Sequence, residues 1–470
     1  MVKIILTAAA VLISAAAYAV VDGDVPAKNA GDVKTTKTAA GTVGKCPAIV
    51  SGLNIFPVKG GVKVTAGKCE VGGKIVSVAE TVLPVDNTEA VTVVNEKTTV
   101  PVCEPGSFWM GRRLKAPDGH DTNCRLSYNP GTVVLRKEPS GKPLILGKDY
   151  LVSDEFGMLG LTENSAASPD EDLYVSYIYS LLRVDSLFVT PEGKVILEKG
   201  KPSVNLPEPP KDKNGCVRIA NIFRPYRANS VTEKDIFPIA EAADKAKTLS
   251  KAGLIPETMA KIKAGKPVTI VCWGDSVTAG GNASTEDKVY VRVFEQMLKA
   301  KYPKADITVI NESVGGSSSL NWLNAPKYPF PGNGVCDFEG RVAVHKPDLV
   351  TIEFVNDAEY PKEMLDEAYN DIEARFKRLG CECILITPHF TAPGWMGFED
   401  MRTAKENRSY VDYALAWAKK QRHAVADASS RWAHLGKEGI PYVTLLSNTL
   451  NHPDDRGHLL FAEELIKCFD

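Results

Sequence analysis

From about residue 235 to the C-terminus, short apolar segments alternate with long amphipathic ones, and this pattern constrains the fold more than any other feature. Residues 267–272 (Pro-Val-Thr-Ile-Val-Cys) form a nearly continuous apolar run, which is typical of a parallel strand buried on both faces. Similar runs recur at 307–310, 349–352, 383–386 and 424–426. Apolar residues at helical spacing predict helices at 289–298, 365–379, 403–422 and 457–469. Alternation of this kind predicts a five-stranded parallel sheet with helices on both faces.

The preceding region has the composition of β structure. Residues 46–105 are rich in Val and Thr, and Gly60-Gly61 and Gly72-Gly73 separate short apolar runs, as in hairpins. Residues 106–230 form a second β-rich region. Strands are predicted there at 132–135, 144–146 and 173–179. We therefore expect a small β-rich unit at 46–105, a β-rich domain at 106–230 and an α/β domain at 235–470.

The N-terminus has the layout of a secretory signal peptide. Lys3 precedes an apolar stretch at 4–17, and Ala17-Tyr18-Ala19 is a small-x-small cleavage site. The stretch is short for a membrane span, which needs about 20 apolar residues. We expect cleavage after Ala19, a flexible linker at 20–45, and a secreted or periplasmic protein without a transmembrane segment; an uncleaved anchor is the alternative.

Cysteine usage fits an exported protein, where disulfides persist. Of the ten cysteines, Cys46 with Cys69 and Cys103 with Cys124 are plausible local pairs, although the sequence does not determine the pairing. Cys272 lies in an apolar run and is expected to be a free core thiol. No Cys/His cluster has the spacing of metal ligands, so no metal is expected. The formal net charge of −2 provides no basic field for nucleic acid.

Four polar motifs follow predicted strands or precede the last helix. They are Gly274-Asp275-Ser276, the loop 311–318 with Gly316, the segment 353–357 with Asn356, and the loop 448–458 with His452 and His458. Because the carboxyl ends of parallel strands meet at one edge of a sheet, these motifs are expected to lie together. Taken singly, each has an ordinary explanation: a capping serine, a flexible loop, a strand-ending turn or a structural histidine.

Together the four motifs resemble the sequence blocks of the SGNH (GDSL-type) hydrolase family, over about residues 265–470. The resemblance implies a three-layer α/β/α sandwich with a five-stranded parallel sheet. It also implies a serine esterase without a cofactor, with Ser276 as nucleophile and His452 as base. The oxyanion hole would be formed by the N–H groups of Ser276 and Gly316 and the side chain of Asn356.

The chain departs from the family pattern at two places. Thr449 stands where the family has the Asp that holds the imidazole, and threonine cannot do so as an anion. Asn448, Asn451 or a backbone carbonyl could orient the ring instead. Phe354 and Val355 stand where the family usually has glycine, and we expect them to crowd the oxyanion side and favour a small acyl group. His458 is expected to be structural.

The predicted substrate is an O-acetyl group on a polysaccharide or oligosaccharide. Export and a β-rich N-terminal half suggest a carbohydrate ester, although this rests on analogy between folds. His389 and Trp395 follow the fourth strand and are candidates to contact the substrate, with core packing as the alternative. Two other hypotheses remain open. One is a lipid or aryl esterase. The other is a catalytically inactive carbohydrate-binding homologue, since Thr449 stands where the family has its Asp.

Overall fold

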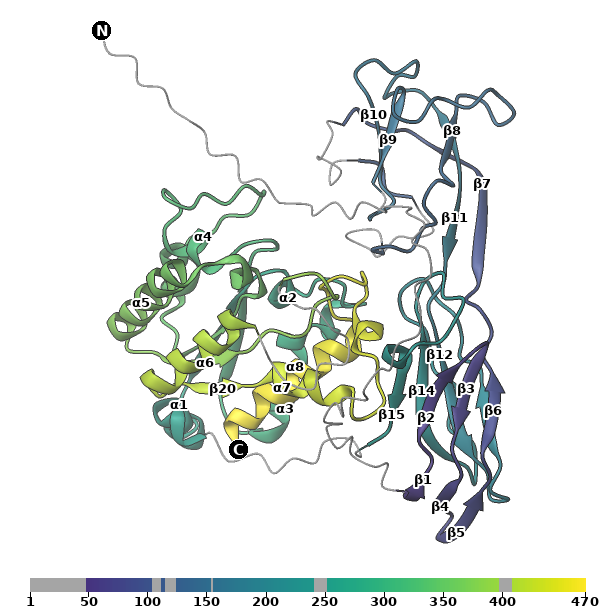
Figure 1. Cartoon of the computed structure of the whole chain (residues 1–470). Coiled ribbons are helices and arrows are strands. Elements are labelled where there is room, and N and C mark those ends of the chain that lie inside the picture. The colour runs from purple at the N-terminus through teal and green to yellow at the C-terminus, as the bar shows by residue number, and fades with distance from the viewer. Residues whose placement is uncertain (1–47, 104–110, 115–123, 154, 241–251, 397–407) are drawn as a thin grey trace, which may run out of the picture. The chain divides into compact units, whose positions relative to one another are not determined.

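The protein is described by a computed structural model that covers residues 48–103, 111–114, 124–153, 155–240, 252–396 and 408–470 (Figure 1). The predicted signal peptide at 1–19 and the predicted linker at 20–45 lie outside these residues. In the part of the chain that is described, no helix is both long enough and apolar enough to cross a membrane.

The C-terminal region is built on one parallel sheet, shown with its helices in teal to yellow in Figure 1. Its five strands run in the order β17-β16-β18-β19-β20, and every neighbouring pair is parallel. Their bounds are β16 Val268–Gly274, β17 Ile307–Ser313, β18 Leu349–Glu353, β19 Glu382–Ile386 and β20 Ala424–Ala426. The prediction of a five-stranded parallel sheet is confirmed, since each predicted apolar run forms one strand.

Successive residues of the sheet contribute to two different cores. Ile270 and Cys272 of β16 pack in one apolar cluster with Phe294 and Phe461, whereas Trp273 packs in a second cluster on the other face. This alternation follows from the pleat of a strand, which directs successive side chains to opposite faces. The second cluster includes side chains of two further helices, so helices cover both faces and the three-layer α/β/α sandwich is confirmed.

The α-helices of this domain, within the described residues, are α1 Pro256–Lys263, α2 Ser276–Ala279, α3 Tyr290–Lys301, α4 Ser319–Leu323, α5 Lys362–Leu379, α6 Ser409–Gln421, α7 Ala428–Leu435 and α8 Asp455–Ile466. Four of them, α3, α5, α6 and α8, coincide with the predicted periodic segments, and the other four were not predicted. Helices α3 and α8 contribute to the first core, and α5 and α6 to the second. The start of the helix predicted at 403–422 lies partly outside the described residues, and α6 accounts for its C-terminal part.

The N-terminal region consists of antiparallel sheets, as predicted. Its strands are β1 Ile49–Gly52, β2 Ile55–Val58, β3 Gly61–Val64, β4 Gly67–Val71, β5 Lys74–Val78, β6 Thr81–Pro84, β7 Ala90–Thr98, β8 Val134–Arg136, β9 Tyr150–Val152, β10 Leu159–Leu161, β11 Leu173–Ser180, β12 Arg183–Val189, β13 Val195–Glu198, β14 Val217–Arg224 and β15 Ile236–Pro238. The prediction of a strand at 144–146 is wrong, because these residues form no strand. The Asp149 carboxylate accepts a hydrogen bond from Ile145 N at 2.7 Å, which holds this segment in a turn.

Strand pairing crosses the boundary that the sequence places near residue 105. Strand β7 pairs along its length with β11. The apolar core in which β3 packs also includes Leu187 and Ile219 from later strands. The domain boundaries themselves stay a prediction. What the sheets show is that the described residues of the two predicted β-rich regions share strand pairing and core.

Two cysteine predictions have different outcomes. Cys272 is a free thiol in the core, and burial raises its pKa to about 12. Cys103 is also a free thiol, so the predicted pair with Cys124 is wrong. The backbone N–H of Cys103 donates to Leu161 O at 2.9 Å, beside β10. Cys46 lies outside the described residues, and its pairing with Cys69 stays a prediction.

Candidate active site

Ser276 lies at the point where β16 turns into α2. The turn begins at Gly274, where a Cβ would lie 2.1 Å from Thr278 Oγ1 and 2.4 Å from Glu353 O, so no larger residue fits there. Asp275 caps the helix, since its Oδ1 accepts a hydrogen bond from Val277 N at 3.0 Å. The tight turn places Ser276 at the carboxyl edge of the sheet, where sites of parallel sheets occur.

The structure brings Ser276 and His452 into direct contact. His452 Nε2 lies 2.9 Å from Ser276 Oγ, and His452 Nδ1 lies 3.0 Å from Asn282 Oδ1. A neutral imidazole donates from one nitrogen and accepts at the other. Because an amide oxygen only accepts, the proton belongs on Nδ1, which leaves the Nε2 lone pair for the serine hydroxyl. This is the arrangement that a general base requires.

The loop that carries His452 is organised by Asn448. Its Oδ1 accepts hydrogen bonds from the backbone N–H groups of Leu450, Asn451 and His452, at 3.0, 2.9 and 3.0 Å. Asn448 therefore holds the backbone of the loop, while the contact to the imidazole comes from Asn282. The sequence analysis named Asn448 and Asn451 as candidates and missed Asn282, although Gly280-Gly281-Asn282 follows the serine motif directly.

The proposed oxyanion donors come from Ser276 itself, Gly316 and Asn356. Gly316 has a φ of +79°, which glycine adopts without steric cost, and a Cβ at Gly315 would lie 3.7 Å from Ser276 Cβ. Asn356 Nδ2 donates to Ser317 O at 3.0 Å and, since an amide carries two N–H groups, keeps one for another acceptor. Within the described residues, the structure records no hydrogen bond from the backbone N–H of Ser276 or Gly316. Assigning these groups to an oxyanion hole remains a proposal.

Phe354 and Val355 do not crowd this side of the site. The Phe354 ring packs edge-on against Trp273, with centroids 4.9 Å apart, in the second core. Val355 is fully buried in the first core. The expectation that they narrow the oxyanion side is wrong, because the strand end directs both side chains into the two cores.

Three buried carboxyl groups lie beneath the serine turn. Burial raises the pKa of Asp275 to about 6, although hydrogen bonds from Val277 N and Asn356 N oppose the shift. Burial also raises the pKa of Asp357 to about 7, and that of Glu353 well above its ordinary value. Asp275 Oδ2 accepts from Asn356 N at 3.1 Å, so this one side chain joins the turn that carries Ser276 to the segment that carries Asn356.

Comparison with known proteins agrees with this geometry. Residues 272–460 match the model of the family described as "GDSL-like Lipase/Acylhydrolase family". This part of the chain resembles that family. Its matched range contains Ser276, Gly316, Asn356 and His452. None of the curated proteins matches the chain significantly.

Among solved structures, the chain is similar to a two-domain esterase active on acetylated mannans, at 19% identity and a TM-score of 0.37, over 45% of this chain and 51% of that one. It is also similar to an acetylxylan esterase from Geobacillus stearothermophilus, at 22% identity and a TM-score of 0.33, over 43% and 94%. An α/β hydrolase from the metagenome of Lake Arreo, Spain, matches at 18% identity and a TM-score of 0.34, over 43% and 96%. The match spans about half the length of the two-domain esterase.

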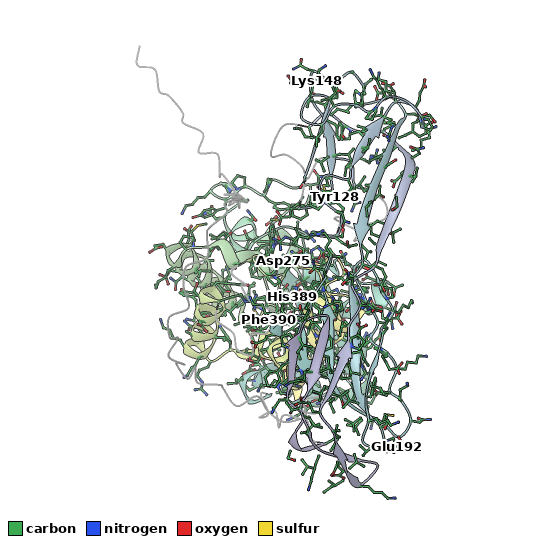
Figure 2. All side chains as sticks on the ribbon, turned by 45° about the vertical axis from the view of Figure 1, so that its right-hand side comes forward. Tyr128, Lys148, Glu192, Asp275, His389 and Phe390 are labelled. Carbon is green, nitrogen blue, oxygen red and sulfur yellow. The ribbon has the colours of Figure 1, made fainter. Side chains whose placement is uncertain are left out.

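His389 is a core residue. It is fully buried, its Nε2 donates to Asn451 O at 2.6 Å, and its ring packs edge-on against Trp432 and Phe461. Figure 2 shows His389 and Asp275 within the α/β domain. Burial lowers the pKa of His389 to about 3, so the ring is neutral. The expectation that it contacts the substrate is corrected, since the ring braces the loop of His452 from inside.

Trp395 and His458 also support the surroundings of His452. Trp395 is half-buried and packs against a small apolar cluster that contains Leu450 and Phe156. It stays a candidate for substrate contact. His458 is buried, accepts from Tyr290 N at 3.4 Å and donates from Nε2 to Gly281 O at 3.3 Å. Burial lowers the pKa of His458 to about 4, consistent with the structural role predicted for it.

Phe330 is a neighbour of the site that the sequence analysis missed. Its ring atoms lie 3.8 Å from the position of a Cβ at Gly316, and its side chain is partly exposed. The ring therefore flanks the glycine whose N–H is proposed to hold the oxyanion. Tyr-Pro-Phe-Pro-Gly at 328–332 gave no periodic signal, because the contact depends on how this loop folds back.

Proposed function

We propose that the chain is a serine esterase that hydrolyses carboxylic esters by two-step acyl transfer. The observation that carries the proposal is the 2.9 Å contact between Ser276 Oγ and His452 Nε2, at the carboxyl edge of a parallel sheet. The match of residues 272–460 to a family named for lipases and acylhydrolases supports the same chemistry.

In the proposed mechanism, His452 Nε2 takes the proton from Ser276 as Oγ attacks the ester carbonyl carbon. The carbonyl oxygen becomes an oxyanion, which accepts hydrogen bonds from the N–H groups of Ser276 and Gly316 and from Asn356 Nδ2. Each such donor is worth about 3 kcal/mol in the transition state. His452 then protonates the leaving alcohol. Water, deprotonated by the same imidazole, releases the acid and restores Ser276.

The proposed substrate is an O-acetyl group on a polysaccharide or oligosaccharide. The predicted signal peptide supports an extracellular or periplasmic location, which mass spectrometry of the mature protein would test: the first residue should be Val20. Phe330 and Trp395 offer aromatic surfaces beside Gly316 and beside the loop of His452, and aromatic faces suit the apolar face of a sugar ring.

The first experiment measures hydrolysis of p-nitrophenyl acetate, butyrate and octanoate by wild type, Ser276→Ala and Ser430→Ala. Ser430 is an exposed serine on α7, remote from the proposed chemistry. We expect activity that is highest on acetate, is lost in Ser276→Ala and is retained in Ser430→Ala. Acetate release from an acetylated oligosaccharide should follow the same order.

Other outcomes point to the competing hypotheses. A rate that rises with acyl length would indicate a lipid or aryl esterase. A fluorophosphonate reagent tests whether Ser276 is activated, whichever ester is natural. If the wild type neither hydrolyses these esters nor becomes labelled at Ser276, the esterase proposal is refuted, and a carbohydrate-binding homologue without catalysis remains.

A further inference from the structure

Thr449, at the position where the resembled family has its catalytic Asp, has a different role in this chain. Thr449 has a φ of +55°, and its backbone N–H donates to Leu446 O at 2.9 Å. Its hydroxyl lies 3.4 Å from Arg125 O, in the β-rich region. Thr449 thus contributes to a turn and to a contact with the β-rich region, and its hydroxyl carries no charge to offer an imidazole.

The contact to His452 Nδ1 comes from a residue 170 positions earlier in the chain. Asn282 Oδ1 lies 3.0 Å from this nitrogen. The residue follows Gly280-Gly281 at the end of α2, and its φ of +64° is a conformation that asparagine adopts more readily than most residues. The same short loop therefore presents Ser276 at its start and an amide to His452 at its end.

The backbone on both sides of Asn282 is fixed. Gly281 N donates to Ser276 O at 2.8 Å, and Gly281 O accepts from His458 Nε2 at 3.3 Å. Beyond Asn282, Asp455 accepts from Ser284 N at 2.8 Å and from Ser284 Oγ at 2.7 Å. His458 and Asp455 both belong to α8, which begins three residues after His452. One helix thus anchors the loop of Asn282 and follows directly on the loop of His452.

From this geometry we propose that Asn282 is the positioning residue for His452, in the role that the resembled family gives to the aspartate at the position of Thr449. Its oxygen keeps the proton on Nδ1 and the ring aligned, which leaves Nε2 to act on Ser276. The role rests on the proposed esterase function. An amide fixes the tautomer but, being neutral, lacks the charge with which an aspartate stabilises the imidazolium. Adding that charge at position 282 should therefore improve the base.

The test compares Asn282→Ala and Asn282→Asp with wild type on p-nitrophenyl acetate across pH. Asn282→Ala should lower kcat about 10-fold or more with little change in KM, since one oriented hydrogen bond is lost. Asn282→Asp should keep or exceed wild-type kcat. Its acid limb should move up by about one pH unit, because an adjacent carboxylate favours the protonated imidazole.

Asn95→Ala is the matched control. Asn95 is another asparagine with a positive φ, at +54°, and it lies in β7, outside the α/β domain. Its replacement should leave kcat and the pH profile unchanged. Like Asn282→Ala, it places alanine at a positive φ, so the two variants should lose similar amounts of backbone stability. Wild-type kcat in Asn282→Ala, or an unmoved acid limb in Asn282→Asp, would overturn the inference.

A second measurement does not depend on any substrate. In protein labelled with ¹⁵N-histidine, the nitrogen shifts of His452 should show the proton on Nδ1 in wild type and a mixture of tautomers in Asn282→Ala. The seven histidines of the chain keep such a spectrum assignable. A wild-type proton on Nε2 overturns the inference. If the proton is on Nδ1 but Ser276 resists the fluorophosphonate, the inference stands and the esterase proposal fails.

Discussion

Gly281→Ala perturbs the site through a single methyl group. An ideal Cβ at Gly281 would lie 3.0 Å from His452 Nδ1, 3.1 Å from His452 Cε1 and 3.0 Å from Ser276 O. At such distances the neighbour must give way by a few tenths of an ångström. The Ser276 oxygen belongs to the backbone of α2, so the imidazole is the group that moves. The 2.9 Å contact between Nε2 and Oγ then lengthens beyond a good hydrogen bond.

The expected loss follows from the size of this displacement. A misplacement of 1 Å in an active site can cost roughly 100-fold in rate, so a few tenths of an ångström should lower kcat by about 5- to 10-fold. KM should change little, because the methyl group acts on the base and leaves the proposed oxyanion donors in place. Gly281 is not among the residues with positive φ, so the backbone itself accepts alanine.

The assay is steady-state hydrolysis of p-nitrophenyl acetate, with thermal unfolding measured in parallel. Gly436→Ala is the control, since a Cβ there meets no atom within 4 Å and its φ of −58° is helical. It should keep wild-type kcat and gain about 0.4–1 kcal/mol of stability. Wild-type kcat in Gly281→Ala would refute the reasoning, because it would show that the imidazole position is not limited by this loop.

Three further predictions test other parts of the structure. Burial, reinforced by the charge of Asp275, raises the pKa of Glu353 well above 4.5. The stability that this group contributes therefore declines as pH rises from about 4.5 towards its folded pKa. In urea titrations, the unfolding free energy of Glu353→Gln relative to that of wild type should increase between about pH 5 and pH 8. Phe330→Ala should raise KM for an acetylated oligosaccharide several-fold at unchanged kcat, and an equal effect on p-nitrophenyl acetate would argue against sugar contact. Arg183→Leu should lower the unfolding free energy, measured by chemical denaturation, by about 3–5 kcal/mol. The reason is that Asp185, which is fully buried and lies 2.7 Å from Arg183, would lose its charge partner. A decrease of less than about 1 kcal/mol would contradict this.

The sheet was predictable because its determinants are local. A strand buried on both faces needs a continuous apolar run, and a helix that covers it needs an apolar stripe at helical spacing. Those patterns survive in the sequence whatever the rest of the chain does. They located all five strands of the α/β domain, and three of the four polar motifs followed from the strand ends, whereas the His452 motif precedes the last helix.

Less was predictable where a side chain had two directions available. At the end of β18, Phe354 and Val355 were expected to face the site, yet each fills a different core. His389 follows β19 and was expected to face the substrate, but it is buried against Trp432 and Phe461. Residue type and spacing do not show which of two neighbouring volumes a side chain will fill, because this depends on how helices such as α8 pack.

The sequence by itself determined the parallel sheet, the order of its strands along the chain, and the serine and histidine that the sheet edge brings together. Only the tertiary structure decided what holds the histidine. Asn282 and His452 lie 170 positions apart, and their contact exists because α8 ties the loop after α2 through His458 and Asp455. Such a contact depends on the packing of one helix against a distant turn, and no periodicity within either segment encodes it.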